Sequence, residues 1–163
     1  MKHSAGKILF AAPLILNFSI CESANREGCA ANESLYFSCI TSRAESIRLC
    51  GAKNLPISGS AHLTYGGKVI NSEKSISKPD LKYNWYSRFQ TEYLRVKFLT
   101  KEISYTLYRD YDQSISKNYK YGVIEKKEGS EVSTPCEKIY KDNLTEFIKG
   151  VTCDNEDALG CRF

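Results

Sequence analysis

Residues 81–111 constrain the fold most strongly, because apolar and polar side chains alternate there through three strand-length runs with short breaks between them. Such alternation is typical of β-strands that turn one face toward a core. We predict a three-stranded antiparallel meander whose turns lie at Phe89-Gln90 and Thr100-Lys101. The pattern places one continuous set of apolar residues on the core face: Leu81, Tyr83, Trp85, Leu94, Val96, Phe98, Ile103, Tyr105 and Leu107.

The two turns also determine which residues of the meander face one another. In the first pair of strands they place Trp85 opposite Leu94, and in the second pair they place Leu94 opposite Leu107. The same register brings Glu92 next to Arg109 at the rim of the core face, where an exposed ion pair stabilises the fold by a few tenths of a kcal/mol at most.

The opposite face of the meander carries the candidate partner-binding surface. Tyrosine combines rigid apolar area with a polar end, and basic side chains add charge, as in many binding surfaces. The alternative is that tyrosine is present as a good strand former and that another sheet or a helix covers this face. At one end Lys82 lies across from Lys97, a like-charge opposition that predicts fraying. The candidate residues are Tyr86, Tyr93, Arg95, Lys97 and Tyr108.

Residues 1–23 have the features of a secretory signal peptide, with two lysines before an apolar run at residues 8–20 that is too short to span a bilayer. Small residues favour cleavage after Ser23, and cleavage after Cys21 is a second possibility. A lipid anchor at Cys21 is not expected, because the residues before it are not the small ones that lipidation requires. We therefore predict a periplasmic or secreted protein without a transmembrane segment, in which residues 24–163 form a single disulfide-stabilised β-rich domain.

Six cysteines remain after residue 23, and an even number in an exported chain predicts three disulfides. A structural zinc site is not expected, since no C-x-x-C spacing occurs and one histidine remains. Cys39 and Cys50 flank a predicted hairpin, and one register places them opposite each other. The other register places Phe37 opposite Gly51 and Cys39 opposite Leu49, which keeps one apolar face but separates the two cysteines. A bulge would satisfy both arrangements. The predicted pairs are Cys39–Cys50, Cys136–Cys153 and Cys29–Cys161.

The rest of the chain predicts further short antiparallel elements. Gly66-Gly67 suits a tight hairpin turn, residues 119–123 and 131–136 alternate as strands, and Gly122 is interpreted as a bulge. Residues 142–150 predict a short helix with an apolar stripe of Leu144, Phe147 and Ile148. The fold class is therefore all-β and mainly antiparallel, a small barrel or sandwich of about eight short strands with one short C-terminal helix.

Charge argues against nucleic acid as a partner. Removal of residues 1–23 leaves 21 basic and 18 acidic side chains, interspersed along the chain. A nucleic-acid-binding surface needs a concentrated basic patch, and a net charge of +3 spread in this way does not supply one.

Few side chains form a recognisable catalytic or metal-binding set. His62 could serve as a general base, but a polar position on an edge strand explains it better. Asp110 and Asp112 could hold a cation or form an acid/base pair, although such residues more often solvate a loop. The acidic residues at 154–157 resemble part of a calcium loop but lack the glycine and the final glutamate of an EF-hand. We therefore expect no cofactor, no metal and no enzymatic activity.

Short segments along most of the mature chain are similar to a family of small exported, cysteine-containing proteobacterial proteins of unknown function. The resemblance implies export and a framework of disulfides, and it implies no catalytic residue. It is carried by Ser34-Leu-Tyr-Phe-Ser-Cys39, Ile47-Arg-Leu-Cys50, Leu63-Thr-Tyr-Gly66, Leu94-Arg-Val-Lys-Phe98, Tyr105-Thr-Leu-Tyr108, Gly122-Val123, Cys136 and Cys153-Asp-Asn-Glu-Asp-Ala-Leu159.

Three functional hypotheses fit these observations. The first is a non-enzymatic exported module that binds another protein, for example an inhibitor or an immunity protein against a toxin or hydrolase that acts on the cell envelope. The second is a small-ligand-binding β-barrel, which would need an open interior. The third is an envelope hydrolase that depends on Asp110 and Asp112. The small size, the disulfides and the tyrosine-rich face favour the first hypothesis.

Overall fold

The computed structural model describes residues 28–54, 61–72 and 80–161. In this part of the chain ten strands form one sheet in the order β10-β5-β6-β7-β8-β9-β1-β2-β3-β4, and all neighbours are antiparallel except β10 and β5. The elements are β1 (Glu33–Thr41), β2 (Ser46–Ala52), β3 (His62–Tyr65), β4 (Lys68–Asn71), β5 (Leu81–Arg88), β6 (Thr91–Leu99), β7 (Ile103–Asp112), β8 (Lys120–Lys127), β9 (Ser130–Asp142), α1 (Leu144–Ile148) and β10 (Thr152–Cys153).

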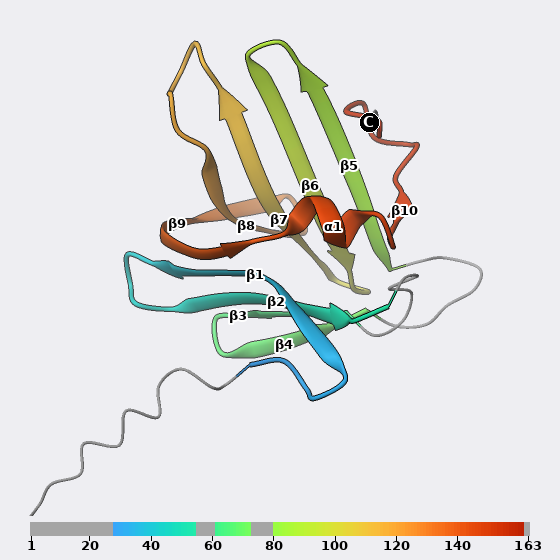
Figure 1. Cartoon of the computed structure of the whole chain (residues 1–163). Helices are drawn as coiled ribbons and strands as arrows, with labels where there is room; N and C mark the ends of the chain where they lie inside the picture. Colours follow the sequence, from blue (N-terminus) through green and yellow to red (C-terminus); the bar gives the residue numbers. More distant parts are fainter. Residues whose placement is uncertain (1–27, 55–60, 73–79, 162–163) are drawn as a thin grey trace, which may run out of the picture.

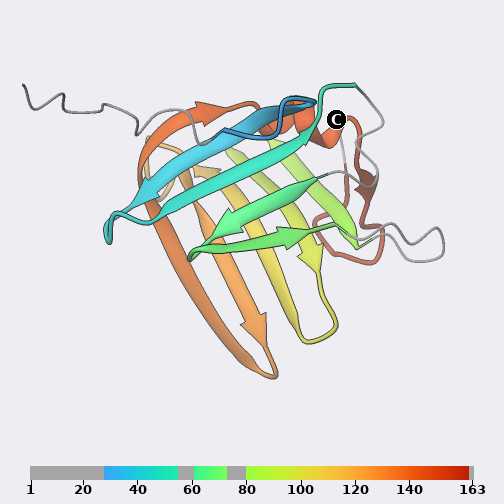
Figure 2. The same ribbon diagram turned by 90° about the horizontal axis from the view of Figure 1, so that it is seen from below.

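The sheet curls into a half-barrel, so that β1–β4 lie across the face of β5–β8 (Figures 1 and 2). The long strand β9 makes this curl possible, because its first part, residues 130–135, pairs with β8 and its second part, residues 136–142, pairs with β1. The predicted fold class, an antiparallel all-β fold with one short C-terminal helix, is confirmed. The number of strands is ten rather than about eight.

The core fills the space inside the curl. Leu49 and Leu63 from one half of the sheet and Leu94 and Val96 from the other half are fully buried. The predicted helix is confirmed as α1, which lies between the two halves at one end (Figure 1). Its buried residues are Leu144, Phe147 and Ile148, the predicted apolar stripe.

The central meander is confirmed as β5–β7, with the turn at Phe89-Gln90 and with Trp85 opposite Leu94. The second register was wrong by two residues, because Leu94 lies opposite Arg109 rather than Leu107. The cause is a wider turn, in which Thr100 bonds to the backbone N–H and carbonyl of Ile103 through its hydroxyl. A shift of two residues leaves every side chain on its predicted face, because side chains alternate with a period of two.

The β1–β2 hairpin adopts neither of the two predicted registers. Phe37 lies opposite Leu49 and Cys39 opposite Ile47, so all four side chains are buried on the core face. A bulge between Leu35 and Phe37 then shifts the register. A bulge is thus present, but it does not bring Cys39 and Cys50 together as predicted. Cys50 lies on the face opposite Cys39, since Leu49 is on the core face and Cys50 is the next residue.

Three disulfides are present, as predicted, but each predicted pairing is wrong. The bridges are Cys29–Cys50, Cys39–Cys136 and Cys153–Cys161, with Cα–Cα distances of 5.5, 5.9 and 6.0 Å. Cys39 cannot reach Cys50, because they face opposite sides of the sheet. Cys39 faces the neighbouring strand β9 instead, while Cys153 and Cys161 both lie beside β5, far from β9 in the strand order. Three disulfides indicate a protein of an oxidising, non-cytoplasmic compartment.

The predicted signal peptide at residues 1–23, including Cys21, lies outside the described residues. Within the ranges that the structure covers, none of the helices has the length and apolar character needed to cross a membrane. The predicted tight turn at Gly66-Gly67 is confirmed between β3 and β4, where both glycines have positive φ angles of 56° and 73°.

Candidate functional site

The candidate site lies on the outer face of β5–β8, the face turned away from the core. Arginine and tyrosine side chains stack there in one row across three strands. We call this row the arginine–tyrosine ladder. It consists of Arg88, Tyr86, Tyr93, Arg95 and Tyr108. Arg88 is exposed, Tyr86, Tyr93 and Arg95 are half-buried, and Tyr108 is buried and supports the row from one end.

The register of the sheet assembles the ladder. Tyr86 lies opposite Tyr93, and their rings stack with centroids 6.1 Å apart at an interplanar angle of 24°. Arg95 lies opposite Tyr108, and its guanidinium carbon is 5.5 Å from the Tyr108 ring centre and 5.8 Å from that of Tyr93. Arg88 follows Tyr86 by two residues on the same face, 5.3 Å from its ring centre. Each cation–π contact stabilises by about 0.5–1 kcal/mol at such sites.

Gly122 lets Tyr108 lie flat on the sheet. A Cβ at Gly122 would stand 2.6 Å from the Tyr108 hydroxyl and 2.4 Å from the backbone oxygen of Thr134, so any side chain would collide with both. The interpretation of Gly122 as a bulge was wrong, because β8 pairs with β7 and β9 there without a register shift. Glycine is required for close approach of the ring and of the neighbouring strand.

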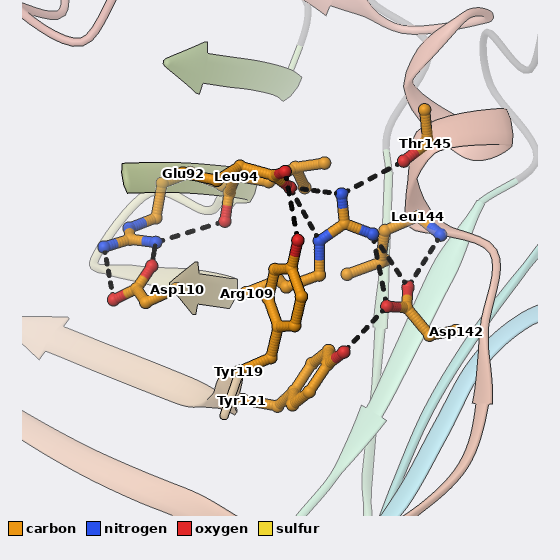
Figure 3. Close-up of polar contacts among 10 residues, drawn as sticks. Glu92, Leu94, Arg109, Asp110, Tyr119, Tyr121, Asp142, Leu144 and Thr145 are labelled. Carbon is orange, nitrogen blue, oxygen red and sulfur yellow. Dashed lines mark hydrogen bonds and ion pairs between the residues drawn. The ribbon is translucent and has the colours of Figure 1, made fainter. Parts of the chain in front are cut away.

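Two carboxylates hold the ladder in place. Asp110 accepts two hydrogen bonds from the Arg95 guanidinium, one of them 2.9 Å long from Nη2 (Figure 3). Asp112 accepts hydrogen bonds from the backbone N–H and hydroxyl of Ser114 at 2.9 and 2.6 Å, and from the Tyr93 hydroxyl at 3.3 Å. The Ser114 bonds lower the pKa of Asp112. Both members of the predicted carboxylate pair are therefore engaged by internal donors.

Lys97 does not belong to the ladder, although the sequence placed it on this face. Its ammonium donates to Asp154 at 2.8 Å and to Asp157, and Lys82 donates to Asp154 at 3.2 Å. The prediction of a frayed end was wrong, because the carboxylate of Asp154 lies between the two opposed lysines and neutralises their repulsion. Two of the three acidic residues that resembled part of a calcium loop, Asp154 and Asp157, bind lysine.

The acidic side chains belong to a segment at residues 152–161, which we call the C-terminal clasp. The Cys153–Cys161 bridge closes it into a loop. Asn84, a fully buried side chain on β5, donates to the Asp154 carbonyl at 2.9 Å and to the Gly160 carbonyl at 3.4 Å. The clasp thus covers one end of the outer face and leaves the ladder beside it.

A second arginine occupies the inner face of the same two strands. Arg109 donates from Nε to Glu92 at 3.0 Å, from Nη1 to Asp142 at 3.2 Å and from Nη2 to Thr145 at 3.1 Å (Figure 3). The hydroxyl of Tyr121 donates to Asp142 at 3.0 Å. This arginine network joins β6, β7, β8, β9 and the start of α1.

Electrostatics keep the arginine network charged and its tyrosine neutral. Burial opposes charge on Arg109, but Asp142 and Glu92 outweigh it and raise the pKa of the guanidinium. Burial, together with the charge and hydrogen bond of Asp142, raises the pKa of Tyr121. The predicted Glu92–Arg109 contact is confirmed. Asp142 and Thr145 were missed because they come from a distant part of the chain, and Tyr121 was missed although it lies opposite Arg109 on the adjacent strand β8.

His62 lies on β3 between β2 and β4, so the prediction of an edge strand was wrong. Its Nδ1 is 3.3 Å from a carboxylate oxygen of Glu33. Cys29, Cys50 and Glu33 place their potential ligand atoms within 4.8 Å of one another. The two sulfurs are bonded to each other, and a disulfide sulfur lacks the thiolate charge that binds metal, so this cluster is not assigned as a metal site.

The sequence matches no protein-family model, and neither the curated proteins nor the solved structures include a significant match to the chain. Fold and site therefore define the protein by class, as a disulfide-bonded β half-barrel from an oxidising compartment.

Proposed function

We propose that the protein is an exported, non-enzymatic module that binds another protein through the arginine–tyrosine ladder. The observation that carries the proposal is the ladder itself. Tyrosine and arginine are the residue types most enriched, with tryptophan, among the side chains that dominate protein–protein affinity. In the described ranges, the clasp lies over Lys82, Asn84 and Lys97 but makes no hydrogen bond to the ladder.

Pre-organisation strengthens this argument. Binding costs about 0.5–1.5 kcal/mol for each flexible side chain that must be immobilised. In the ladder the Tyr86 ring stacks on Tyr93, and Arg95 is fixed between two rings and Asp110. A partner therefore meets a surface whose side chains have already lost much of their freedom.

The partner that fits this surface presents carboxylates and backbone carbonyls next to apolar groups. The Arg88 guanidinium at the exposed end of the ladder lies over the Tyr86 ring and forms no hydrogen bond or ion pair with the described side chains, so its donors suit an acidic group. We propose an inhibitor or immunity protein against an envelope-targeting toxin or hydrolase, because such proteins need a rigid scaffold more than a catalytic centre. We also propose that the protein is a member of the family of small exported proteobacterial proteins that its short sequence segments resemble.

The structure gives no specific support to the two alternative hypotheses, a small-ligand-binding β-barrel and a carboxylate-dependent envelope hydrolase. The interior contains fully buried Phe37, Phe98 and Phe147, which fill space that a bound ligand would need. A hydrolase based on Asp110 and Asp112 would have to release carboxylates that Arg95 and Ser114 now hold.

The test compares two matched variants in capture experiments from an envelope extract. The first is Tyr86→Ser with Tyr93→Ser in the ladder. The control is Tyr140→Ser, which removes an exposed tyrosine that also lies under a cation, with the Lys138 ammonium 5.2 Å from its ring centre. We expect the ladder variant to lose at least about tenfold in affinity for a partner that the wild-type protein and the control both retain.

Circular dichroism and urea unfolding confirm that the ladder variant is folded before capture is compared. A folded ladder variant that retains every partner at wild-type affinity would exclude the ladder as the binding surface.

A further inference from the structure

The two most exposed large apolar side chains of the described chain lie together at one end of the sheet. Phe89, in the β5–β6 turn, is 90% exposed, and Ile115, in the β7–β8 loop, is 70% exposed. The two loops are joined, because the backbone N–H of Gln113 donates to the carbonyl of Gln90 at 2.9 Å. They form the upper end of the sheet in Figure 1, and we call this end the loop tip.

The loop tip carries positive charge that is not neutralised locally. Arg88, Lys117 and Lys120 are exposed around it. Two of the carboxylates at this end are paired with other cations, Glu92 with Arg109 and Asp110 with Arg95. Asp112 is held by the uncharged Ser114, so its charge offsets one of the three cations and the loop tip keeps a net positive charge. In the ranges described, none of the three cations forms an ion pair, although Lys120 lies opposite Asp110 in the sheet.

Tyrosines form a layer directly below the apolar end. Tyr119 is 44% exposed, and its ring lies 5.0 Å from that of Tyr111. On the outer face, Tyr86 lies next to Arg88 in the ladder. From the loop tip toward the core, the apolar side chains of Phe89 and Ile115 therefore come first, the cations and tyrosines second, and the folded core last. Membrane interfaces select this order, because tyrosine and basic side chains favour the headgroup level and apolar side chains the acyl boundary.

We propose that the loop tip binds the surface of an anionic phospholipid bilayer. Phe89 and Ile115 enter the boundary between headgroups and acyl chains, and the three cations contact lipid phosphates. Two apolar side chains bury too little area for a stable protein interface, which needs a continuous patch of about 800 Å² on each partner. The same two side chains suffice for reversible membrane attachment when anionic lipid adds electrostatic attraction.

The inference does not rest on the proposed protein-binding function. Membrane binding by the loop tip would also fix the location of the ladder, because Arg88 and Tyr86 connect the loop tip to the ladder. A partner bound to the ladder would lie beside the membrane surface.

The test is sedimentation of the purified, oxidised protein with vesicles. One set contains phosphatidylcholine alone, and the other contains equal parts of phosphatidylcholine and phosphatidylglycerol. The tip variant is Phe89→Ser with Ile115→Ser, and the matched control is Val69→Ser with Val132→Ser, which removes two exposed apolar side chains elsewhere. We expect about tenfold weaker binding to the anionic vesicles for the tip variant and unchanged binding for the control.

Insertion is measured separately with Phe89→Trp in the background of Trp85→Phe, which leaves one tryptophan in the chain. We expect the emission of this tryptophan to shift to shorter wavelength when anionic vesicles are added. The proposal is overturned if the wild-type protein does not sediment with anionic vesicles, if the tip variant sediments as well as the control, or if the emission does not shift. Loss of a captured protein partner by the tip variant, with vesicle binding intact, would assign the tip to that partner and also overturn the proposal.

Discussion

Arg109 and Arg95 occupy adjacent strands of the same sheet, and each pairs with a carboxylate, yet the two arginines serve different purposes. Their side chains are similarly shielded, 12% and 17% exposed, so burial does not separate them. Their partners do. Arg109 bonds to Glu92 on the neighbouring strand β6 and also to Asp142 on β9 and Thr145 on α1, which are distant in the chain. Arg95 bonds to a carboxylate of the neighbouring strand and stacks on two tyrosines. An arginine that joins distant elements stabilises the fold, and one that orders a surface prepares it for a partner.

Replacement of the two arginines tests this difference directly and has the largest expected effect. Arg109→Met leaves Glu92 and Asp142 half-buried without their cation, and we expect it to lower the free energy of unfolding by about 3 kcal/mol. Arg95→Met removes an ion pair at the surface and two cation–π contacts, with an expected loss of about 1 kcal/mol. Urea unfolding under non-reducing conditions measures both values.

Arg109→Lys serves as the control for charge. It keeps the positive charge but cannot reach three acceptors with one planar group, so an intermediate loss of stability is expected. Equal losses for Arg109→Met and Arg95→Met would contradict the distinction between the two faces.

Gly122→Ala tests whether the ladder depends on the packing beneath it. The new methyl group collides with the Thr134 carbonyl and the Tyr108 ring, and we expect the free energy of unfolding to fall by about 2 kcal/mol. Removing the ring as well, in Gly122→Ala with Tyr108→Ala, should not restore stability, since the carbonyl is part of the backbone. Full recovery in the double variant would show that Tyr108 alone required the glycine.

The C-terminal clasp predicts a loss of stability in acid. Burial opposes the charge of Asp154, but hydrogen bonds from Lys97 and Lys82 outweigh it and lower its pKa from 3.8. A carboxylate with a lowered pKa in the folded state stabilises the fold above the unfolded pKa, and this stabilisation is lost as the pH falls through the lowered value. The free energy of unfolding should therefore decrease below about pH 4.

Asp154→Asn identifies the source of this acid dependence. We expect it to cost about 1 kcal/mol at neutral pH, because both lysines lose a charged partner, and to flatten the dependence below pH 4. Glu156→Gln is the control, since Glu156 is exposed on the same segment. A wild-type slope in Asp154→Asn would place the acid-sensitive group elsewhere.

The alternation of side chains predicted which face of the meander is the core and which carries the ladder. This prediction survived an error in register, because a displacement of two residues moves Arg109 into the place expected for Leu107 without changing its face. Arg88 could also have been assigned to the ladder, since it follows Tyr86 by two residues on the same strand. Local periodicity contains this information.

The periodicity of side chains does not predict which segments that are far apart in the sequence will be neighbours in the fold. Cys39 pairs with Cys136 across a separation of 97 residues, because β9 bends from one half of the sheet to the other. Asp154 reaches Lys82 because β10 runs parallel to β5, and no pattern within either segment indicates that contact. The disulfide pairs and the acidic partners of both lysines were therefore beyond prediction from the sequence.

Double-mutant cycles separate the two arginines most sharply, and the coupling within the outer pair is the smallest effect that we expect. For the outer pair, Arg95→Met and Asp110→Asn should couple by about 0.5 kcal/mol, and the coupling should shrink as salt is added. For the inner pair, Arg109→Met and Glu92→Gln should couple by about 2 kcal/mol with less dependence on salt, because Asp142 and Thr145 also fix the guanidinium and because Glu92 is less exposed than Asp110, 17% against 26%. An outer coupling as large as the inner one would mean that Arg95 is held for stability, which would leave the ladder with less reason to be a binding surface.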